Sequence, residues 1–544
     1  MATTASMIIR DANIRTQNPA QPRAEAVAFD GDTIIAVGSL ASVLELRGAT
    51  TEVVDAGGRT LTPGLIDGHI HPLMGAAATR GVDFGGVTTM PEFLKRLRTE
   101  ADRILREDPQ AWLRGWNLDY GVFAGRTITA EEIEDAVHRL PTAVFFFDMH
   151  TMLASSEALA RAGVTGAVHF DDVSQIVLDD DGRPTGEVRE ATAYDHVLAA
   201  APVLTRADGI GISRRVLAQL NSSGITGGCV MDGDAEAIDF LEEMAETGPG
   251  LPVRLVTALR HGPERDDDGI AEFISLRDRK GRHWRGGVIK MFLDGVIDTG
   301  TGWLSEPDTM GEGLLPFWPD PAHYAKTVER YAAAGFQIAT HAIGDRAISA
   351  AIDAYLAVGV IAKNGVPHRI EHLEYLADED LPRLAAAGIT ASMQPLHLQW
   401  RKADGSDSWA TRLGPERTTR AWRIRDIMRA GAPVALGSDW PVAQLDARIG
   451  MAWARLRRTP GERDGFVFEP DQRLTAEEAL DGFTTWSAAA QGDGSQLGKI
   501  EVGFKADVAL WADDPVAVDA DDLVDVPVHL TVVGGDVVHR HDDV

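Results

Sequence analysis

The chain has 544 residues, of which 44% are hydrophobic and 25% charged, values typical of a compact globular protein and not of a disordered one. Asp and Glu number 82 against 52 Lys and Arg, and the resulting formal charge of −30 disfavours nucleic acids and anionic membranes as partners. The single cysteine, Cys229, excludes an intrachain disulfide, and no apolar run is long enough to span a membrane, so we expect a cytoplasmic protein.

Short apolar runs near both ends of the chain predict β-strands. They cover residues 7–9, 26–29 and 33–37 on the N-terminal side, and 506–511, 529–533 and 537–538 on the C-terminal side. Neither set could bury its own apolar face, so we predict that residues 1–61 and 500–544 form one small β-sandwich domain. Two unrelated edge hairpins are the alternative.

Between the termini, apolar strand-like runs alternate with Ala- and Leu-rich helical stretches. The clearest runs are residues 287–292, 337–341 and 433–439, and helices are expected at 324–334, 346–358, 378–387 and 423–430. This alternation predicts an α/β fold, and over this length a (β/α)8 TIM-type barrel at residues 62–499. Residues from about 84 to 211 interrupt the alternation and are expected to form an insertion over the barrel mouth.

Polar residues close several of these runs, and active sites of such barrels lie at the carboxyl ends of the strands. The first run ends in His69 and His71, which project from one face because they are two residues apart in an extended strand. Lys290, His341, His372 and Asp439 lie within or at the ends of later runs and continue this series of polar residues. Because histidine and aspartate are standard ligands of zinc and similar ions, the series predicts a metal site.

Some of these residues also have purely structural interpretations. His341 could be a core histidine bonded to a carbonyl, Lys290 could pair with Asp294, and Asp439 could cap the following helix. Coincidence at so many strand ends is improbable, so we interpret them together as one site. Asp67, just before the histidine pair, is expected to orient an imidazole.

The residues around these positions resemble the amidohydrolase superfamily, and within it the N-substituted formamide deformylase-like branch. The resemblance rests on His341-Ala-Ile-Gly-Asp345, Arg369-Ile-Glu-His372, Ser392-Met-Gln-Pro395 and Gly437-Ser-Asp-Trp-Pro441. Parts of the expected insertion, such as residues 115–117 and 148–150, are similar as well, so the resemblance runs from Met7 to Val538. It implies a metal-dependent hydrolase on a (β/α)8 barrel with a small β-sandwich.

The resemblance also implies roles for individual residues. His69, His71, His341 and His372 would bind the metal, and Asp439 would be both a ligand and the general base. The expected cofactor is one or two divalent ions, with zinc as the first expectation.

Lys290 matches the position whose amine, carboxylated by CO2, bridges two metals in that superfamily. A carbamate is an anionic ligand with two oxygens, whereas an ammonium beside cations would be costly. A single metal with unmodified Lys290 also fits, and Cys229 as a bridging thiolate is a third option.

The expected reaction is hydrolysis of a non-peptide C–N bond in an amide, N-substituted formamide or carbamate-like small molecule by metal-activated hydroxide. Asp439 would take a proton from water and return it to the leaving nitrogen. The alternatives are a cyclic-amide or imidazolone hydrolase or deaminase with the same site and, in another class, a non-catalytic metal-binding regulatory protein.

Substrate contacts are expected from residues in or near the mouth of the barrel, namely His150, Gln394, His397, Trp440 and Trp116. An apolar pocket could be formed by Trp112, Trp116, Trp303, Phe317 and Trp318. The exposed barrel helices and the terminal sandwich are compatible with a homodimer.

Overall fold

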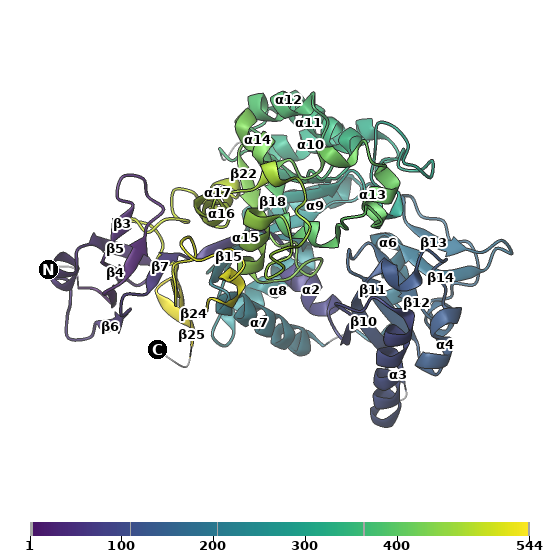
Figure 1. Cartoon of the computed structure of the whole chain (residues 1–544), viewed down its shortest axis with the longest axis horizontal. Helices are drawn as coiled ribbons and strands as arrows, with labels where there is room; N and C mark the ends of the chain where they lie inside the picture. The colour runs from purple at the N-terminus through teal and green to yellow at the C-terminus, as the bar shows by residue number, and fades with distance from the viewer. Residues whose placement is uncertain (1–3, 109, 204, 363–364, 542–544) are drawn as a thin grey trace.

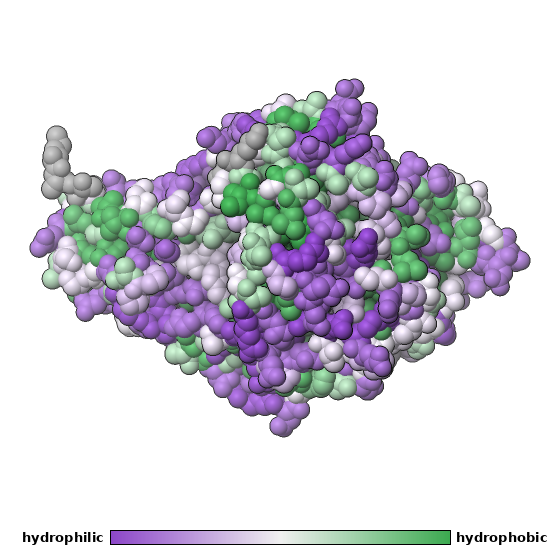
Figure 2. All heavy atoms as spheres, turned by 90° about the horizontal axis from the view of Figure 1, so that it is seen from above, coloured by the Kyte–Doolittle hydropathy of each residue, from purple (hydrophilic) through white to green (hydrophobic). Residues whose placement is uncertain are grey.

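The computed structural model describes residues 4–108, 110–203, 205–362 and 365–541. Along its longest axis the protein has sheets from both termini at one end, a barrel in the middle and a separate sheet with its helices at the other end (Figure 1). Seen from above, hydrophilic residues cover much of the surface, with hydrophobic groups among them (Figure 2). Within the described residues, no helix has the length and apolar character needed to cross a membrane.

Eight parallel strands form the barrel, and each pairs with the next in chain order. They are β8 (Leu65–Ile70), β15 (Ile225–Gly233), β16 (Arg254–Arg260), β18 (Trp284–Phe292), β19 (Gln337–Ala342), β20 (Arg369–His372), β21 (Thr390–Met393) and β22 (Val434–Leu436). Between the last strand and the first, the Asp439 amide donates to the His69 carbonyl at 2.8 Å, so the barrel is nearly closed. The predicted α/β fold with a TIM-type barrel is confirmed.

The outer helices begin and end where the sequence provides caps. In α10 (Pro321–Ala334), Asp320 accepts from the Ala322 amide, Pro321 starts the first turn, and Gly335 ends the helix at φ 93°. Its neighbours are α11 (Asp345–Val358), α12 (Asp380–Ala387) and α14 (Ile424–Ala430), each within a few residues of the predicted bounds. Further helices around the barrel are α7 (Arg206–Ser222), α8 (Ala235–Glu246), α9 (Asp267–Leu276) and α15 (Ala447–Leu456).

Apolar side chains, most of them small or branched, fill the barrel interior below the site. Cys229, Met231, Val256, Ala258, Val288 and Ala339 form one buried apolar cluster. Because inward positions recur every second residue of a strand, Val288 lies one layer below Lys290, and Ala339 one layer below His341. The polar residues of the site therefore rest on a packed apolar layer.

The strands near the two termini form two sheets with a common apolar core. One sheet contains β1 (Met7–Arg10), β4 (Ala26–Asp30), β5 (Thr33–Gly38) and β6 (Glu52–Asp55); the other contains β2 (Asn13–Arg15), β3 (Arg23–Ala24), β7 (Thr60–Pro63), β23 (Val508–Trp511), β24 (Val528–Val533) and β25 (Asp536–Arg540). Ile9 and Phe29 from the first sheet and Leu61 and Leu510 from the second belong to one buried cluster. The domain bounds 1–61 and 500–544 stay a prediction.

A six-stranded mixed sheet lies on the other side of the barrel (Figure 1). Its strands are β9 (Val82–Asp83), β10 (Leu113–Leu118), β11 (Thr142–Phe146), β12 (Thr151–Ala154), β13 (Gln175–Leu178) and β14 (Pro184–Arg189), and α3 (Met90–Glu107), α4 (Glu131–Val137) and α6 (Ala191–Leu198) accompany it. The short helix α2 (Pro72–Ala78) leads to this sheet from His71. Helix α7 begins inside the predicted insertion at Arg206, yet Leu217 and Leu220 of this helix belong to the barrel core.

Candidate active site

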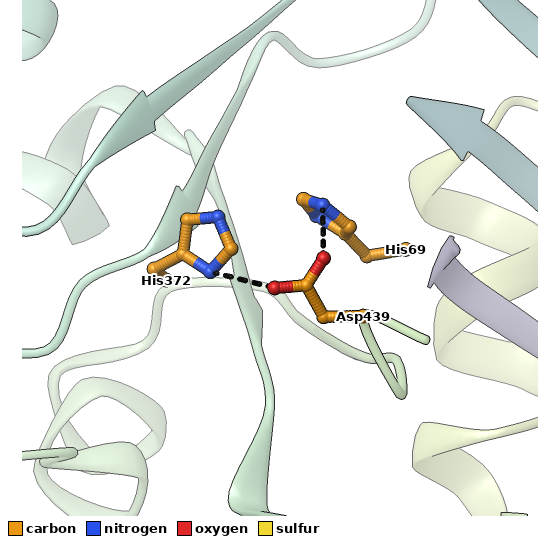
Figure 3. Close-up of side chains that lie close together, drawn as sticks. All are labelled: His69, His372 and Asp439. Atoms are coloured by element: carbon orange, nitrogen blue, oxygen red, sulfur yellow. Dashed lines mark ion pairs between the residues drawn. The ribbon is translucent and has the colours of Figure 1, made fainter. Parts of the chain in front are cut away.

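Three buried side chains meet at the carboxyl end of the barrel (Figure 3). The Asp439 carboxylate lies with Oδ1 3.2 Å from His69 Nε2 and Oδ2 3.9 Å from His372 Nδ1. One ligand atom from each residue lies within 4.8 Å of the others. His69 is near the end of β8, His372 ends β20, and Asp439 follows β22, so three strands deliver a donor set that suits a divalent ion.

His71, which directly follows β8, also lies close to Asp439. Its Nε2 is 2.9 Å from Asp439 Oδ1 and 3.2 Å from His69 Nε2. Its other nitrogen, Nδ1, lies 3.4 Å from Asp232 Oδ1. Burial lowers the pKa of His71, but Asp232 and Asp439 outweigh burial and raise this pKa to about 9. The protein alone therefore favours a positive charge at a position that a metal ion could occupy instead.

A chain of charged hydrogen bonds fixes the orientation of His69. Glu371 Oε2 is 2.6 Å from His69 Nδ1, and Arg369 donates to both carboxylate oxygens of Glu371, at 2.5 and 3.0 Å. Arg369 Nη2 also donates to the Gly68 carbonyl and to Ser392 Oγ, each at 2.6 Å. Burial raises the pKa of Glu371, but Arg369 and His69 outweigh burial and hold it far below its usual range. Glu371 is therefore an ionised partner that directs His69 Nε2 towards Asp439.

The expectation that Asp67 orients an imidazole is wrong. Asp67 Oδ1 instead accepts from the backbone amides of His69, at 3.1 Å, and Ser438, at 3.0 Å. A Cβ at Gly437 would lie 2.5 Å from the His69 nitrogen, so this turn and the end of β8 are in close contact. Asp67 therefore connects the backbone segment of His69 to that of Asp439 and helps to fix the distance between these two residues.

His341 and Lys290 lie beside this cluster. The His341 ring centroid is 4.5 Å from that of His372, while His341 Nε2 lies 3.0 Å from the Gly295 carbonyl, as its structural interpretation expected. Lys290 Nζ is buried and has no hydrogen-bond partner among the described residues. It does not pair with Asp294, which instead accepts three backbone amides. Burial lowers the pKa of Lys290 to about 8, so its neutral amine, the form that reacts with CO2, is readily accessible.

Cys229 lies in the apolar layer within the barrel. Its neighbours in that layer include Val256 and Val288, and its side chain is fully buried. Burial raises the pKa of the Cys229 thiol to about 11. The environment therefore disfavours the thiolate that a bridging role would need.

The cavity above the cluster has two lobes, which share His150, His341, His372 and Asp439 in their linings. The first lobe has an open volume of about 500 Å³ and is lined by Phe147, Asp298, Glu374, His397, Trp400, Arg401, Trp409 and Trp422. The second has an open volume of about 670 Å³ and is lined by His71, Met74, Met149, Tyr194, Asp232, Arg260, Lys290 and Phe317. The candidate metal centre is therefore open on two sides.

The residues expected to contact substrate fall into two groups. His150 and His397 line the cavity, and His397 Nε2 is 3.4 Å from Asp439 Oδ2. Gln394 Oε1 instead lies 2.9 Å from His372 Nδ1, the nitrogen that also faces Asp439, and Gln394 lines neither lobe. Trp440 and Trp116 are not among the residues that line either lobe; a Cβ at Gly75 would lie 2.4 Å from the Trp440 ring.

Most of the aromatic residues expected to form a pocket are core residues. Trp303 and Trp318 belong to the barrel core and Trp112 to the core of the insertion sheet, whereas Phe317 does line the second lobe. The first lobe takes its tryptophans from residues 400–422, which we did not propose. Asp232 was also missed, although it lies near the end of β15 and follows the same strand-end pattern as the predicted residues.

Comparison with known proteins agrees with this architecture. The family model for the amidohydrolase family matches residues 52–539. An N-substituted formamide deformylase of Arthrobacter pascens is 26% identical over 562 residues, covering 98% of each chain. Protein LONG AFTER FAR-RED 3 of Arabidopsis thaliana is 27% identical over 533 residues, covering 93% of this chain and 87% of the relative.

A solved structure of an uncharacterized metal-dependent hydrolase from Pyrococcus horikoshii OT3 has a TM-score of 0.73 and 24% identity; the match covers 94% of this chain and 99% of that chain. This likeness supports the fold. The family match spans most of the chain and confirms the predicted metal-dependent amidohydrolase: the protein belongs to the amidohydrolase family.

Proposed function

We propose that this amidohydrolase cleaves a non-peptide C–N bond in a small amide, N-substituted formamide or carbamate-like molecule. The observation that carries the proposal is the Asp439 carboxylate, held between His69, His71 and His372 on the floor of a two-lobed cavity. Such a carboxylate can both bind a divalent ion and transfer protons. A formamide deformylase among the relatives supports the type of bond.

The donor atoms around Asp439 fit a metal ion. Lys290 Nζ is buried without a hydrogen-bond partner among the described residues, although buried polar atoms are normally paired. His71 Nδ1 and His397 Nε2 lie 3.4 Å from carboxylate oxygens of Asp232 and Asp439. We assign the metal ligands to His69, His71, His372 and Asp439, with Lys290, carboxylated or not, and His341 on the side where a second ion would lie. Zinc is the proposed metal. When bound, the ion would polarise the scissile carbonyl and make water more acidic.

In the proposed reaction, the proton is transferred by side chains of the protein. Burial raises the pKa of Asp439, but His69, His397 and His71 outweigh burial and hold it well below its usual range, so Asp439 is ionised and can accept a proton from water. The same carboxylate can deliver this proton to the departing nitrogen, so that an acid and an amine are released. Glu371 keeps His69 in the orientation that presents Nε2 to the site.

The first lobe offers a place for an apolar N-substituent. Phe147 and Trp400 are stacked with ring centroids 4.2 Å apart, and Trp409 and Trp422 lie 4.8 Å apart. Such flat apolar walls bind aromatic or aliphatic groups. His150 and His397, at the floor of this lobe, are positioned to contact the substrate carbonyl or its substituent.

We also propose that the two terminal sheets form one β-sandwich domain, residues 1–61 and 500–544, beside the barrel domain. The buried cluster that Phe29 and Leu510 share supports this assignment. The domain would stabilise the barrel from outside, because Arg254 at the start of β16 donates to Asp507 Oδ2 at 2.7 Å.

The experiment is elemental analysis of the purified protein together with a panel of N-substituted formamides, N-acyl amines and carbamates. We expect a stoichiometric divalent metal and turnover that chelation abolishes and added metal restores. Absence of such a metal, or absence of chelation-sensitive turnover across the panel, would overturn the proposal and favour a non-catalytic role.

A further inference from the structure

Two arginines beside the active site lack a counter-ion. Arg80 follows α2, and Arg114 lies in β10 of the insertion sheet. Neither forms an ion pair within 4.0 Å among the described residues, although the chain carries a formal charge of −30. Arg80 Nε donates to the Ala77 carbonyl at 2.9 Å, and Arg114 Nε is buried without a partner. Unpaired charges in partly buried positions are costly, so this arrangement needs an explanation.

The fold brings the two residues together. Strands β9 and β10 pair in parallel with Val82 opposite Gly115, so the segment that carries Arg80 runs beside Arg114. Gly81 has φ 91°, and a Cβ there would lie 1.9 Å from the Arg114 carbonyl oxygen, so the two backbones are in contact. Burial and the charge of Arg80 lower the pKa of Arg114 to about 10, and burial lowers that of Arg80. The two positive charges therefore destabilise each other.

The arginines line a cavity that adjoins the second lobe of the active site. This cavity has an open volume of about 1480 Å³ and shares Met74, Met149, Tyr194, Asp232 and Arg260 with the second lobe. Helix α2 connects the two places along the chain, since it begins directly after His71 and ends two residues before Arg80. With seven residues, α2 is about 10 Å long. About the length of this helix therefore separates the backbone of His71 from the segment that carries Arg80.

We propose that Arg80 and Arg114 bind a carboxylate of the substrate, at the end remote from the scissile C–N bond. A planar guanidinium matches a carboxylate with paired hydrogen bonds, and an incoming anion would neutralise the repulsion between the two arginines. Met74 and Met149 line the path and suit an apolar spacer. The inference rests on the proposed function and narrows its substrates to N-acylated amino acids with a long spacer between nitrogen and carboxylate.

The kinetic test compares N-formyl-ε-aminocaproate with its uncharged analogue N-formylhexylamine. In the wild type we expect kcat/KM to favour the carboxylate by at least roughly 10-fold, mainly through KM. Arg114→Gln and Arg80→Gln should each remove most of this preference while turnover of N-formylhexylamine is unchanged. Arg98→Gln, at an exposed site on α3, is the matched control and should keep the preference. Equal preference in the wild type and both arginine variants would overturn the assignment.

Calorimetry on the metal-loaded protein separates this inference from the proposed function. N-acetyl-ε-aminocaproate should bind the wild type and Arg98→Gln equally, Arg114→Lys nearly as well, and Arg114→Gln and Arg80→Gln at least several-fold more weakly. This result would support the carboxylate site even if no formamide is hydrolysed. Inorganic phosphate that binds through the same arginines, without any preference for the carboxylate compound, would overturn the substrate assignment in favour of a free-anion site. Thermal melting of each variant identifies a loss caused by misfolding.

Discussion

The two sides of the metal centre differ in how fully the protein pairs their polar atoms. On one side, His69 is held by Glu371, which Arg369 holds in turn through two hydrogen bonds. On the other side, Lys290 Nζ is buried without a hydrogen-bond partner among the described residues, and His71 Nδ1 lies no closer than 3.4 Å to its carboxylate neighbour, Asp232. The first side is thus preorganised by the protein alone, whereas the second retains bonding capacity for an ion or a substrate.

The largest effect on stability should follow from Glu371→Gln. This change removes a charge from a fully buried pair and leaves the Arg369 guanidinium uncompensated, so we expect the free energy of unfolding to fall by about 3–5 kcal/mol. Urea denaturation measures this loss. Glu374→Gln is a matched control within the cavity, where Trp409 Nε1 donates to Glu374 at 2.9 Å, and it should cost clearly less. Equal costs would show that the Arg369–Glu371 pair contributes no more to stability than an ordinary buried carboxylate.

Protonation of His368 at acidic pH is expected to lower the free energy of unfolding by up to about 3 kcal/mol. His368 lies at the opposite end of β20 from His372. Burial lowers the pKa of His368 to about 4, and its Nδ1 accepts from the Ile338 amide at 3.1 Å. Because the folded pKa is below the unfolded value near 6.5, this stability is present above pH 6.5 and is lost as the pH falls towards 4.

Stability measured across this pH range tests the contribution of His368. The variant His368→Gln should show a shallower decline between pH 6.5 and 4 than the wild type. Parallel curves for the two proteins would show that His368 does not titrate as described.

The smallest effect on stability should come from Lys290→Met. Replacing an unpaired buried amine by an apolar chain of similar length should leave the unfolding free energy of the metal-free protein unchanged or raise it by about 1 kcal/mol. Activity and metal content should nevertheless fall. Elemental analysis beside thermal melting checks both statements, and a strongly destabilised apoprotein would show that Lys290 has a structural partner.

The barrel and its strand-end residues were predictable because the sequence patterns that indicate them, apolar runs followed by polar residues, are local. His69, His71, His341, His372 and Asp439 each follow an apolar run, and parallel strands bring such positions to one rim. The expected role of Asp67 failed because a carboxylate near a histidine in sequence can bond backbone amides as easily as an imidazole.

The lining of the cavity was not predictable to the same extent. Trp409 and Trp318 are both buried in the barrel core, yet only Trp409 lines a lobe of the cavity, and this difference arises from tertiary packing. The arginine pair likewise depends on the pairing of β9 with β10. The residues that line the cavity therefore depend on tertiary packing that local sequence patterns do not reveal.

The most direct test of the central claim is the turnover and metal content of Asp439→Asn, measured beside Asp426→Asn on α14 as a control. Asparagine keeps the shape and one oxygen donor but cannot carry the proton. We predict an unchanged fold, nearly full metal content and a turnover number reduced by about 10²–10⁴-fold, with the control unaffected. Turnover equal to that of the wild type in a metal-loaded Asp439→Asn protein would contradict the role of Asp439 as the proton carrier.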